Sequence, residues 1–378
     1  MSSTPARVLD RSDLAAARRI VVKVGSGVVA RDGRMRTAVI RRLAADVAEA
    51  RAGGREIVMV VSGSVAAGCG PLGLAKAPKA VLERQVVASV GQPLLMARLA
   101  EAFAPYKTLT AQLLMSADDI ENRRRFMSAR HTMLGLLARG VIPIINENDA
   151  LSEHEAIIGD NDHLAALVTS VISADWLIIL STARGVMEQA GAGPLISRVE
   201  VGSRLDAHID QSLSATGVGG MRAKVAAAHL ASQWGVPTLI AEGRGGALPR
   251  ILAGRDIGTL FVPDKRALPA RKRWIAIRSR SRGQIIVDDG ARRALTERGA
   301  SLLPAGITDV RGDFPMGARV DICTPDGVSF AVGLVSYGSD EIRRVKGRKQ
   351  SEIAGILGYE YYREIVHRDD LVLLSEKT

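Results

Sequence analysis

Residues 141–150 of this chain read V-I-P-I-I-N-E-N-D-A and residues 156–164 read A-I-I-G-D-N-D-H-L, so two clusters of carboxylates and amides flank one loop. The apolar run Val141–Ile145 is typical of a buried parallel strand, and a helical pattern over His163–Ile172 follows the second cluster. Ligands of open α/β sheets bind beyond the carboxyl ends of the strands. The clusters therefore predict a site for a small molecule with a positive group and hydrogen-bonding oxygens, such as an α-amino acid. Turn and cap roles are the alternative for each cluster taken alone.

Bulk properties limit the class of protein. A length of 378 residues exceeds one ordinary core and predicts two domains. No apolar run approaches the ~20 residues of a membrane-spanning helix, so no membrane partner is expected. With only Cys69 and Cys323, a disulfide framework is not expected, and a reducing cytoplasm is the expected compartment. A net charge of +11 favours anionic partners, either nucleotides or nucleic acid.

Two glycine-rich turns are suited to phosphate. The strand Ile20–Val24 carries Lys23 and runs into Gly25 and Ser26, and Thr216–Lys224 opens a helix that carries Lys224 in its first turns. Glycine lets backbone N–H groups approach phosphate oxygens, and a helix N-terminus favours anions. The first turn lacks the P-loop spacing, and its alternative is glycine in a tight turn for backbone reasons alone. The alternative for the second turn is an ordinary helix start.

The alternation of strand and helix patterns predicts the fold class. We expect an α/β domain with a mainly parallel open sheet sandwiched by helices, joined by right-handed crossovers. The strand Glu56–Val61 delivers Ser62 and Gly63 to the same edge as the other polar loops. We expect the helix over Ala80–Phe103 to be interrupted near Gly91-Gln92-Pro93 and Thr259–Val262 to be a final edge strand.

The pattern changes near residue 263. We predict a domain over residues 1–262, a linker over 263–273 with two prolines, and a small, mostly β domain over 274–378 with short strands and frequent turns. Basic residues gather at Arg343–Lys349 and would suit RNA phosphates. A solvated loop is the alternative for that run.

The sequence predicts phosphoryl transfer to a small acceptor, because two lysines lie on separate glycine turns and a carboxylate–amide pocket accompanies them. Lys23 and Lys224 would neutralise the charge of the transferring group from two sides. Asp162 would hold both ammonium groups and keep them protonated, and Asp160 would support it or approach a metal. An acceptor that is a carboxylate needs no general base. Mg²⁺ would travel with the nucleotide, bound through phosphates and water, and no metal site built from protein is predicted.

The motifs V-V-K-V-G-S-G, V-V-S-G-S-V-A-A-G, I-N-E-N-D-A, G-D-N-D-H-L and G-G-M-R-A-K, in this order, resemble the amino acid kinase family. The tail resembles a PUA domain through G-A-S-L-L-P-A-G-I and V-R-G-D-F-P-M-G. The combination is similar to the branch of the family that phosphorylates L-glutamate. It implies ATP-dependent phosphorylation of the glutamate γ-carboxylate to L-glutamate 5-phosphate, the first step of proline biosynthesis. It also implies a homo-oligomer, feedback inhibition by proline, and RNA as a partner of the PUA-like domain.

The resemblance also implies roles for individual residues. Acceptor binding falls to Ser62, Gly63, Asn146, Asp149 and Asn161. Contacts to ATP fall to residues on three segments: Lys23, Gly25, Ser26, Ser181, Thr182, Val218, Gly219, Gly220, Met221, Arg222, Ala223 and Lys224.

The chain departs from the family pattern at three places. Thr182 stands where an aspartate is usual, and Ala223 where a hydroxyl residue is common before the lysine. The loop after Thr182 is shortened and reads Gly185-Val186-Met187 instead of the usual Gly-Leu-Tyr. These departures concern nucleotide binding. Because Lys23, Asp162 and Lys224 are retained, an active kinase is predicted. The alternatives are a kinase of another acidic amino acid, such as N-acetylglutamate or aspartate, and an RNA-binding or regulatory protein with a degenerate kinase site.

Overall fold

The computed structural model of this protein describes residues 9–31, 33–151, 160–188, 193–200, 203, 205, 220–244, 246–263, 281–360 and 362–374. The contacts of the chain divide it into two compact units, Met1–Asp118 with His131–Arg266 and Asp119–Arg130 with Ala267–Thr378. The division into residues 1–262, 263–273 and 274–378 stays a prediction, because most of the predicted linker lies outside the described residues.

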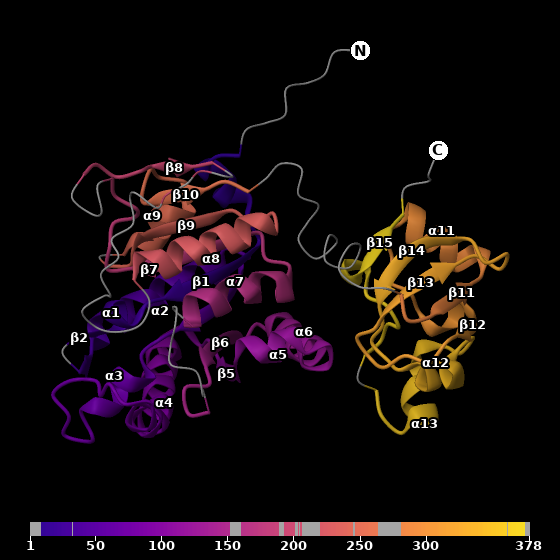
Figure 1. The fold of residues 1–378 in the computed structure, drawn as a ribbon, viewed down its shortest axis with the longest axis horizontal. Coiled ribbons are helices and arrows are strands. Elements are labelled where there is room, and N and C mark those ends of the chain that lie inside the picture. The colour runs from indigo at the N-terminus through magenta and orange to yellow at the C-terminus, as the bar shows by residue number, and fades with distance from the viewer. Residues whose placement is uncertain are drawn as a thin grey trace, which may run out of the picture. The chain divides into compact units, whose positions relative to one another are not determined.

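In the described part of the first unit, eight strands form one sheet in the order β5-β6-β4-β1-β7-β9-β10-β8 (Figure 1). The strands are β1 (Arg19–Val24), β4 (Glu56–Val61), β5 (Thr110–Met115), β6 (Ile142–Glu147), β7 (Trp176–Ser181), β8 (Arg198–Val199), β9 (Thr238–Glu242) and β10 (Thr259–Phe261). From β5 to β9 all neighbours are parallel, which confirms the predicted mainly parallel sheet. A separate hairpin pairs β2 (Ala30–Arg31) with β3 (Arg34–Met35).

The outer strands differ from the prediction. β10 runs antiparallel to β9, and β8 pairs on its other side, so β10 is not the edge strand. β8 has only two residues, too few for a hydrophobic period to be visible in the sequence.

Helices cover both faces of this sheet, as predicted. These helices are α1 (Ser26–Val29), α2 (Thr37–Ala52), α3 (Ser64–Cys69), α4 (Val81–Phe103), α7 (Asp160–Ile172), α8 (Met221–Gln233) and α9 (Ala247–Leu252), with short 3-10 turns at η1 (Arg11–Ala16) and η2 (Ala104–Tyr106). Two further helices, α5 (Ala117–Glu121) and α6 (Arg123–Ala138), each have residues in both units. Helices α2, α4 and α9 share one apolar core with alternate residues of β1, including Val22 and Val24. Because side chains alternate along a strand, Lys23 lies on the opposite face, which α7 and α8 cover (Figure 1).

Helix α4 is continuous through Gly91-Gln92-Pro93, so the predicted interruption is wrong. Gly91 meets α3 so closely that a Cβ there would overlap the carbonyl oxygen of Ser64 and the amide nitrogen of Gly68. Glycine in α4 therefore serves helix packing rather than a break. By length and composition alone, Val81–Tyr106 could cross a membrane. Its face with Leu95, Leu99 and Phe103 belongs to the apolar core of the unit, which accounts for its hydrophobicity.

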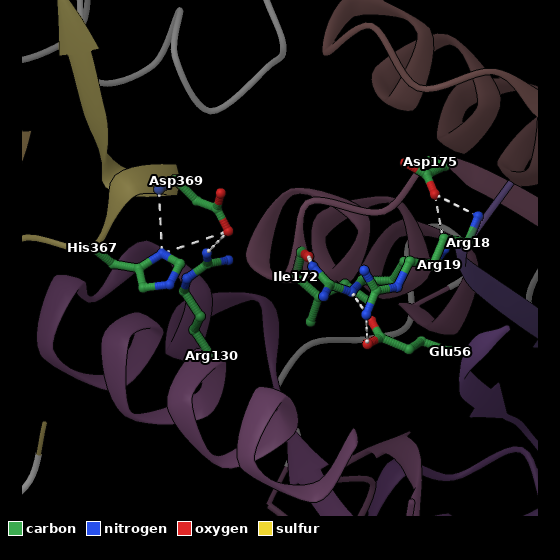
Figure 2. A network of polar contacts seen from close by, with 8 residues as sticks. All are labelled: Arg18, Arg19, Glu56, Arg130, Ile172, Asp175, His367 and Asp369. Carbon is green, nitrogen blue, oxygen red and sulfur yellow. Dashed lines mark hydrogen bonds and ion pairs between the residues drawn. The ribbon is translucent and has the colours of Figure 1, made fainter. Parts of the chain in front are cut away.

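The amino ends of three strands are tied together at the edge of the sheet away from the polar loops (Figure 2). Asp175 Oδ2 accepts hydrogen bonds of 2.8 Å from the backbone N–H groups of Arg18 and Arg19. The guanidinium of Arg19 binds Glu56 at 2.7 Å and donates at 2.6 Å to the carbonyl oxygen of Ile172, the last residue of α7. β1 and α7 are thereby fixed to each other at one end, while their other ends carry Lys23 and Asp162.

The described part of the second unit is a five-stranded sheet in the order β12-β11-β13-β14-β15, with short helices. Its elements are β11 (Gln284–Val287), α11 (Asp289–Glu297), η5 (Pro304–Gly306), β12 (Ile307–Arg311), β13 (Arg319–Cys323), β14 (Ser329–Leu334), α12 (Ser339–Val345), η6 (Gln350–Glu352), α13 (Ile353–Leu357), η7 (Arg368–Asp370) and β15 (Leu371–Leu373). The predicted mostly β character of this part is confirmed.

Candidate functional site

Parallel strands carry the predicted polar residues to one edge of the sheet. Lys23 lies one residue before the end of β1, Ser62 directly follows β4, and Ser181 ends β7. Asn146 lies near the end of β6, and α7 and α8 begin at Asp160 and Met221. Because all these strands run in the same direction, their carboxyl ends meet at the position where open α/β sheets bind ligands.

Three buried charges form one cluster at this edge. Asp162 Oδ1 lies 2.6 Å from Lys23 Nζ, and its Oδ2 lies 3.1 Å from Lys224 Nζ. Lys23 is 4% exposed, Asp162 1% and Lys224 7%. The carboxylate thus bridges two ammonium groups, as the sequence predicted. Two ammonium groups held away from water are suited to stabilising an anionic group.

The pKa of Lys23 is lowered from its ordinary value, chiefly because burial penalises the charged ammonium. Asp162 opposes this by favouring the charged form, and Lys224 adds to the lowering by repulsion. The prediction that Asp162 supports the protonated state of Lys23 is therefore right in sign, but burial outweighs it. An anionic ligand between the lysines would act in the same direction as Asp162.

A chain of amide hydrogen bonds lies beside the charged cluster. Asn161 Nδ2 donates to Asn146 Oδ1 at 2.9 Å, and Asn161 Oδ1 accepts from the backbone N–H of Glu147 at 3.1 Å. Asn146 Nδ2 in turn donates to Gln92 Oε1 at 2.7 Å. The two polar clusters of the sequence are thus brought together. Asn146 and Glu147 are the last residues of β6 rather than residues that follow it, because their backbone continues the pairing with β5.

Asp149 forms a second group of polar contacts, separate from the chain of amides. Its carboxylate accepts a short hydrogen bond from the hydroxyl of Ser64 at the start of α3. Burial raises the pKa of Asp149, and the hydrogen bond from Ser64 and the charge of Arg84 lower it in part. Asp149 is half-buried, and the effect of this burial on its pKa outweighs the effects of these two partners.

The S-G-S turn after β4 differs in detail from the prediction. Ser62 uses its backbone N–H to bind the carbonyl oxygen of Val24 at 3.1 Å, while Ser64 makes the contact to Asp149. Gly63 has φ +135°, a conformation that residues with a Cβ rarely adopt. The sequence analysis missed Ser64 and Gln92 as site residues. Ser64 stood inside a motif already identified, whereas Gln92 lies 54 positions from its partner in the chain, and no local pattern could reveal that pairing.

The first predicted phosphate turn is partly used by the protein itself. The backbone N–H of Gly25 donates to the carbonyl oxygen of Leu180 at 3.0 Å, so this amide is not free for a phosphate as the fold stands. Ser26 begins the single-turn helix α1. At the end of β7, Ser181 is buried and Thr182 is exposed. The carbonyl oxygen of Ser181 accepts from the N–H of Gly243 at 2.8 Å, which holds this strand end in place.

The second predicted phosphate turn lies partly outside the described residues, as do Val218, Gly219 and the side chain of Asp160. Gly220 is the N-cap of α8 in an extended conformation. In the first turn Met221 and Arg222 reach the surface, whereas Ala223 and Lys224 are buried. The helix therefore delivers Lys224 inward, to Asp162, in its first turn.

Comparison with known proteins places this site in context. A model described as "Amino acid kinase family" matches residues 18–242, and one for the PUA domain matches residues 283–357. The glutamate 5-kinase of Geobacter sulfurreducens is 45% identical over 370 residues, covering 96% of this chain and 99% of its own. That of Syntrophotalea carbinolica is 43% identical over 366 residues, covering 95% and 98%. A carbamate kinase structure from Giardia gives a TM-score of 0.47 at 17% identity, covering 66% of this chain and 100% of its own.

Proposed function

The chain belongs to the amino acid kinase family, and we propose that it is a glutamate 5-kinase, which transfers the γ-phosphoryl group of ATP to the γ-carboxylate of L-glutamate. The product, L-glutamate 5-phosphate, is the first intermediate of proline biosynthesis. Likeness to relatives of that name over almost the whole chain supports the proposal. The buried Lys23–Asp162–Lys224 cluster next to an amide and carboxylate pocket is the observation that carries it.

The charged cluster serves the transfer step. A transferring phosphoryl group spreads negative charge over its oxygens, and catalysis consists mainly of positioning and charge stabilisation. Lys23 and Lys224 approach from β1 and α8, and Asp162 fixes the position of both ammonium groups. The acceptor carboxylate is ionised at neutral pH, so the reaction needs no general base. That agrees with a site made of fixed charges.

The amide and hydroxyl groups serve the acceptor. Asp149 is a half-buried carboxylate whose pKa is raised by burial, and an α-ammonium group would add a counter-charge to the hydrogen bond from Ser64 and the charge of Arg84. Asn161, Asn146 and Ser62 are the donors for the acceptor's carboxylates. This set favours a free amino acid over N-acetylglutamate, whose acylated nitrogen carries no charge.

ATP is the co-substrate of the proposed reaction, and Mg²⁺ accompanies it. Both oxygens of Asp162 already face lysines, and no group of three or more His, Cys, Asp or Glu side chains suited to a metal occurs in the part of the chain that is described. In the proposal, Mg²⁺ is held mainly by nucleotide phosphates and water, where it would neutralise phosphate charge. Gly220, Met221, Arg222 and the residues before them are the proposed nucleotide contacts of α8.

Other properties are proposed from the family alone. They are a cytoplasmic location, assembly into a homo-oligomer, feedback inhibition by proline, and RNA binding by the PUA domain. The rival function is a regulatory or RNA-binding protein with a degenerate nucleotide site, and Thr182 in place of the usual aspartate is the observation that favours it.

The test is turnover by purified protein with ATP, Mg²⁺ and L-glutamate, in which hydroxylamine traps the acyl phosphate. N-acetylglutamate and L-aspartate are the alternative acceptors, and Lys224→Met is the inactive control. The proposal expects hydroxamate with glutamate alone and none from the control. Folded protein that yields no hydroxamate with any acceptor would exclude the kinase and favour the rival.

A further inference from the structure

The hydrogen-bond chain between α4 and the candidate acceptor site has a defined direction. A backbone N–H can only donate, so the atom of Asn161 that faces the N–H of Glu147 must be its oxygen. Asn161 then presents its nitrogen to Asn146 Oδ1, and Asn146 presents its nitrogen to Gln92 Oε1. One backbone group thus sets the orientation of three side-chain amides, and Gln92 is the last of them.

The free end of this chain is a buried donor. Gln92 is 8% exposed, and its Nε2 is buried without a hydrogen-bond partner among the described residues. A buried amide nitrogen without an acceptor is unfavourable. The nitrogen lies at the end of a chain that starts at the proposed acceptor residues, so an acceptor oxygen of a bound carboxylate would satisfy it.

Next to Gln92, helix α4 packs closely against α3. The neighbouring Gly91 touches the backbone of Ser64 and Gly68, with no room for a Cβ. Ser64 in turn donates its hydroxyl to Asp149. Helix α4 therefore contacts both parts of the candidate acceptor site. The side chain of Gln92 contacts the amide of Asn146, which binds Asn161, and the backbone of Gly91 contacts Ser64, which binds Asp149.

We propose that Gln92 is a positioning and specificity residue for the acceptor. Its Oε1 holds Asn146 and Asn161 in the orientation in which their remaining amide hydrogens meet an acceptor's carboxylate, and its Nε2 is a further donor for that carboxylate. The inference deepens the proposed function and rests on it, because glutamate supplies the carboxylate. It assigns to α4 a role that the sequence motifs around residues 23, 62, 146, 161 and 224 do not contain.

The test compares Gln92→Met, which keeps the length of the side chain and removes both hydrogen-bonding atoms, with wild type. The KM for glutamate should rise about tenfold, and the KM for ATP should stay within about twofold, because one or two hydrogen bonds to the acceptor are lost. Leu99→Ala is the matched control, a buried change two turns along the same helix. It should lower the urea midpoint and leave both KM values near wild type.

Gln92→Glu separates positioning from packing and decides the question if Gln92→Met does not fold. Its carboxylate still accepts from Asn146, but it becomes a donor only when protonated. The ratio of its glutamate KM to that of wild type should therefore fall as the pH is lowered from about 8 to about 6. A pH-independent ratio would overturn the proposal.

The outcomes separate this inference from the proposed function. Wild type that forms hydroxamate with glutamate, together with an unchanged glutamate KM in Gln92→Met, would overturn only the role of Gln92. A parallel rise in both KM values, or the same rise in Leu99→Ala, would reduce Gln92 to a packing residue. Wild type that is inactive on glutamate would end the proposed function and this inference together.

Discussion

The two halves of the candidate site act through different interactions, one through charges and the other through hydrogen bonds. The half around Asp162 consists of three buried charges, with the carboxylate between two ammonium groups at 2.6 Å and 3.1 Å. The half around Asn161 consists of neutral amides and a hydroxyl, with Asp149 as its carboxylate. Charges act over distance and tolerate displacement, whereas amides act only through directed contacts. We therefore assign phosphoryl transfer to the first half and recognition of the acceptor to the second.

The largest effect should come from Asp162→Asn. The change removes the negative charge that lies between two buried ammonium groups, and breaking a buried pair in this way costs about 3–5 kcal/mol of unfolding free energy. The loss of positioned lysines should also lower kcat by about 10²–10³. Urea unfolding and steady-state kinetics measure the two effects.

Asp46→Asn is the matched control for Asp162→Asn. Asp46 is also buried, but its partner Arg42, at 3.0 Å, is largely exposed, so no buried cation is stranded. This variant should keep wild-type kcat. Equal loss of stability and activity in both variants would contradict the special role of the charged half.

Lys224→Met should have the next largest effect, confined to activity. Asp162 keeps Lys23 as its partner, so the fold should persist. The kcat should fall about 10²–10³, because one of the two lysines that would stabilise the negative charge of the phosphoryl group is gone. Ser232→Ala, a buried change two turns along the same helix, should leave kcat unchanged. A Lys224→Met variant with near wild-type kcat would remove this lysine from the transfer step.

Asp149→Asn should raise the glutamate KM by about 10- to 100-fold, because a charge-assisted contact to the ammonium is lost. It should also stabilise the protein at neutral pH. The pKa of Asp149 is raised on folding, so wild-type stability falls as pH rises from the unfolded value of 3.8 through the folded pKa. The amide that replaces the carboxyl group does not titrate, so the advantage of the variant should grow over that window. An advantage that is largest below pH 3.8 would contradict this sign.

Thr182→Asp should have the smallest effect. It restores the carboxylate usual in the family at an exposed position after β7, and the KM for ATP should fall about two- to tenfold. The KM for glutamate should not change. Thr182→Asn is the uncharged control. A shift in the glutamate KM instead would place Thr182 on the acceptor side of the site.

The sequence predicted the parallel sheet because its strands are apolar runs bounded by polar loops. It predicted the charged half for the same reason, since Lys23, Asp162 and Lys224 each stand at the end of an element, and the structure joins them. The amide half was predicted less completely. Asn146 and Asn161 lie 15 positions apart and were found, but Gln92 comes from a helix 54 positions away, where it looked like part of a break.

Very short strands were also not predictable from the sequence. β8 and the hairpin of β2 and β3 have two residues per strand, and their pairing depends on neighbours rather than on their own pattern. The interruption predicted in α4 was wrong because Gly91 packs against α3 and Pro93 is tolerated within a continuous helix. A glycine or proline in a helical pattern indicates either a break or a close packing contact, and only the tertiary structure shows which of the two applies.

The central claim is that one half of the site transfers the phosphoryl group and the other recognises the acceptor. Steady-state titration of glutamate with Lys224→Met and Asn161→Ala, side by side, tests it most directly. The account predicts that Lys224→Met lowers kcat with the glutamate KM within about threefold, and that Asn161→Ala raises that KM at least about tenfold with kcat within about threefold. Two variants that change the same parameter by similar factors would contradict the division.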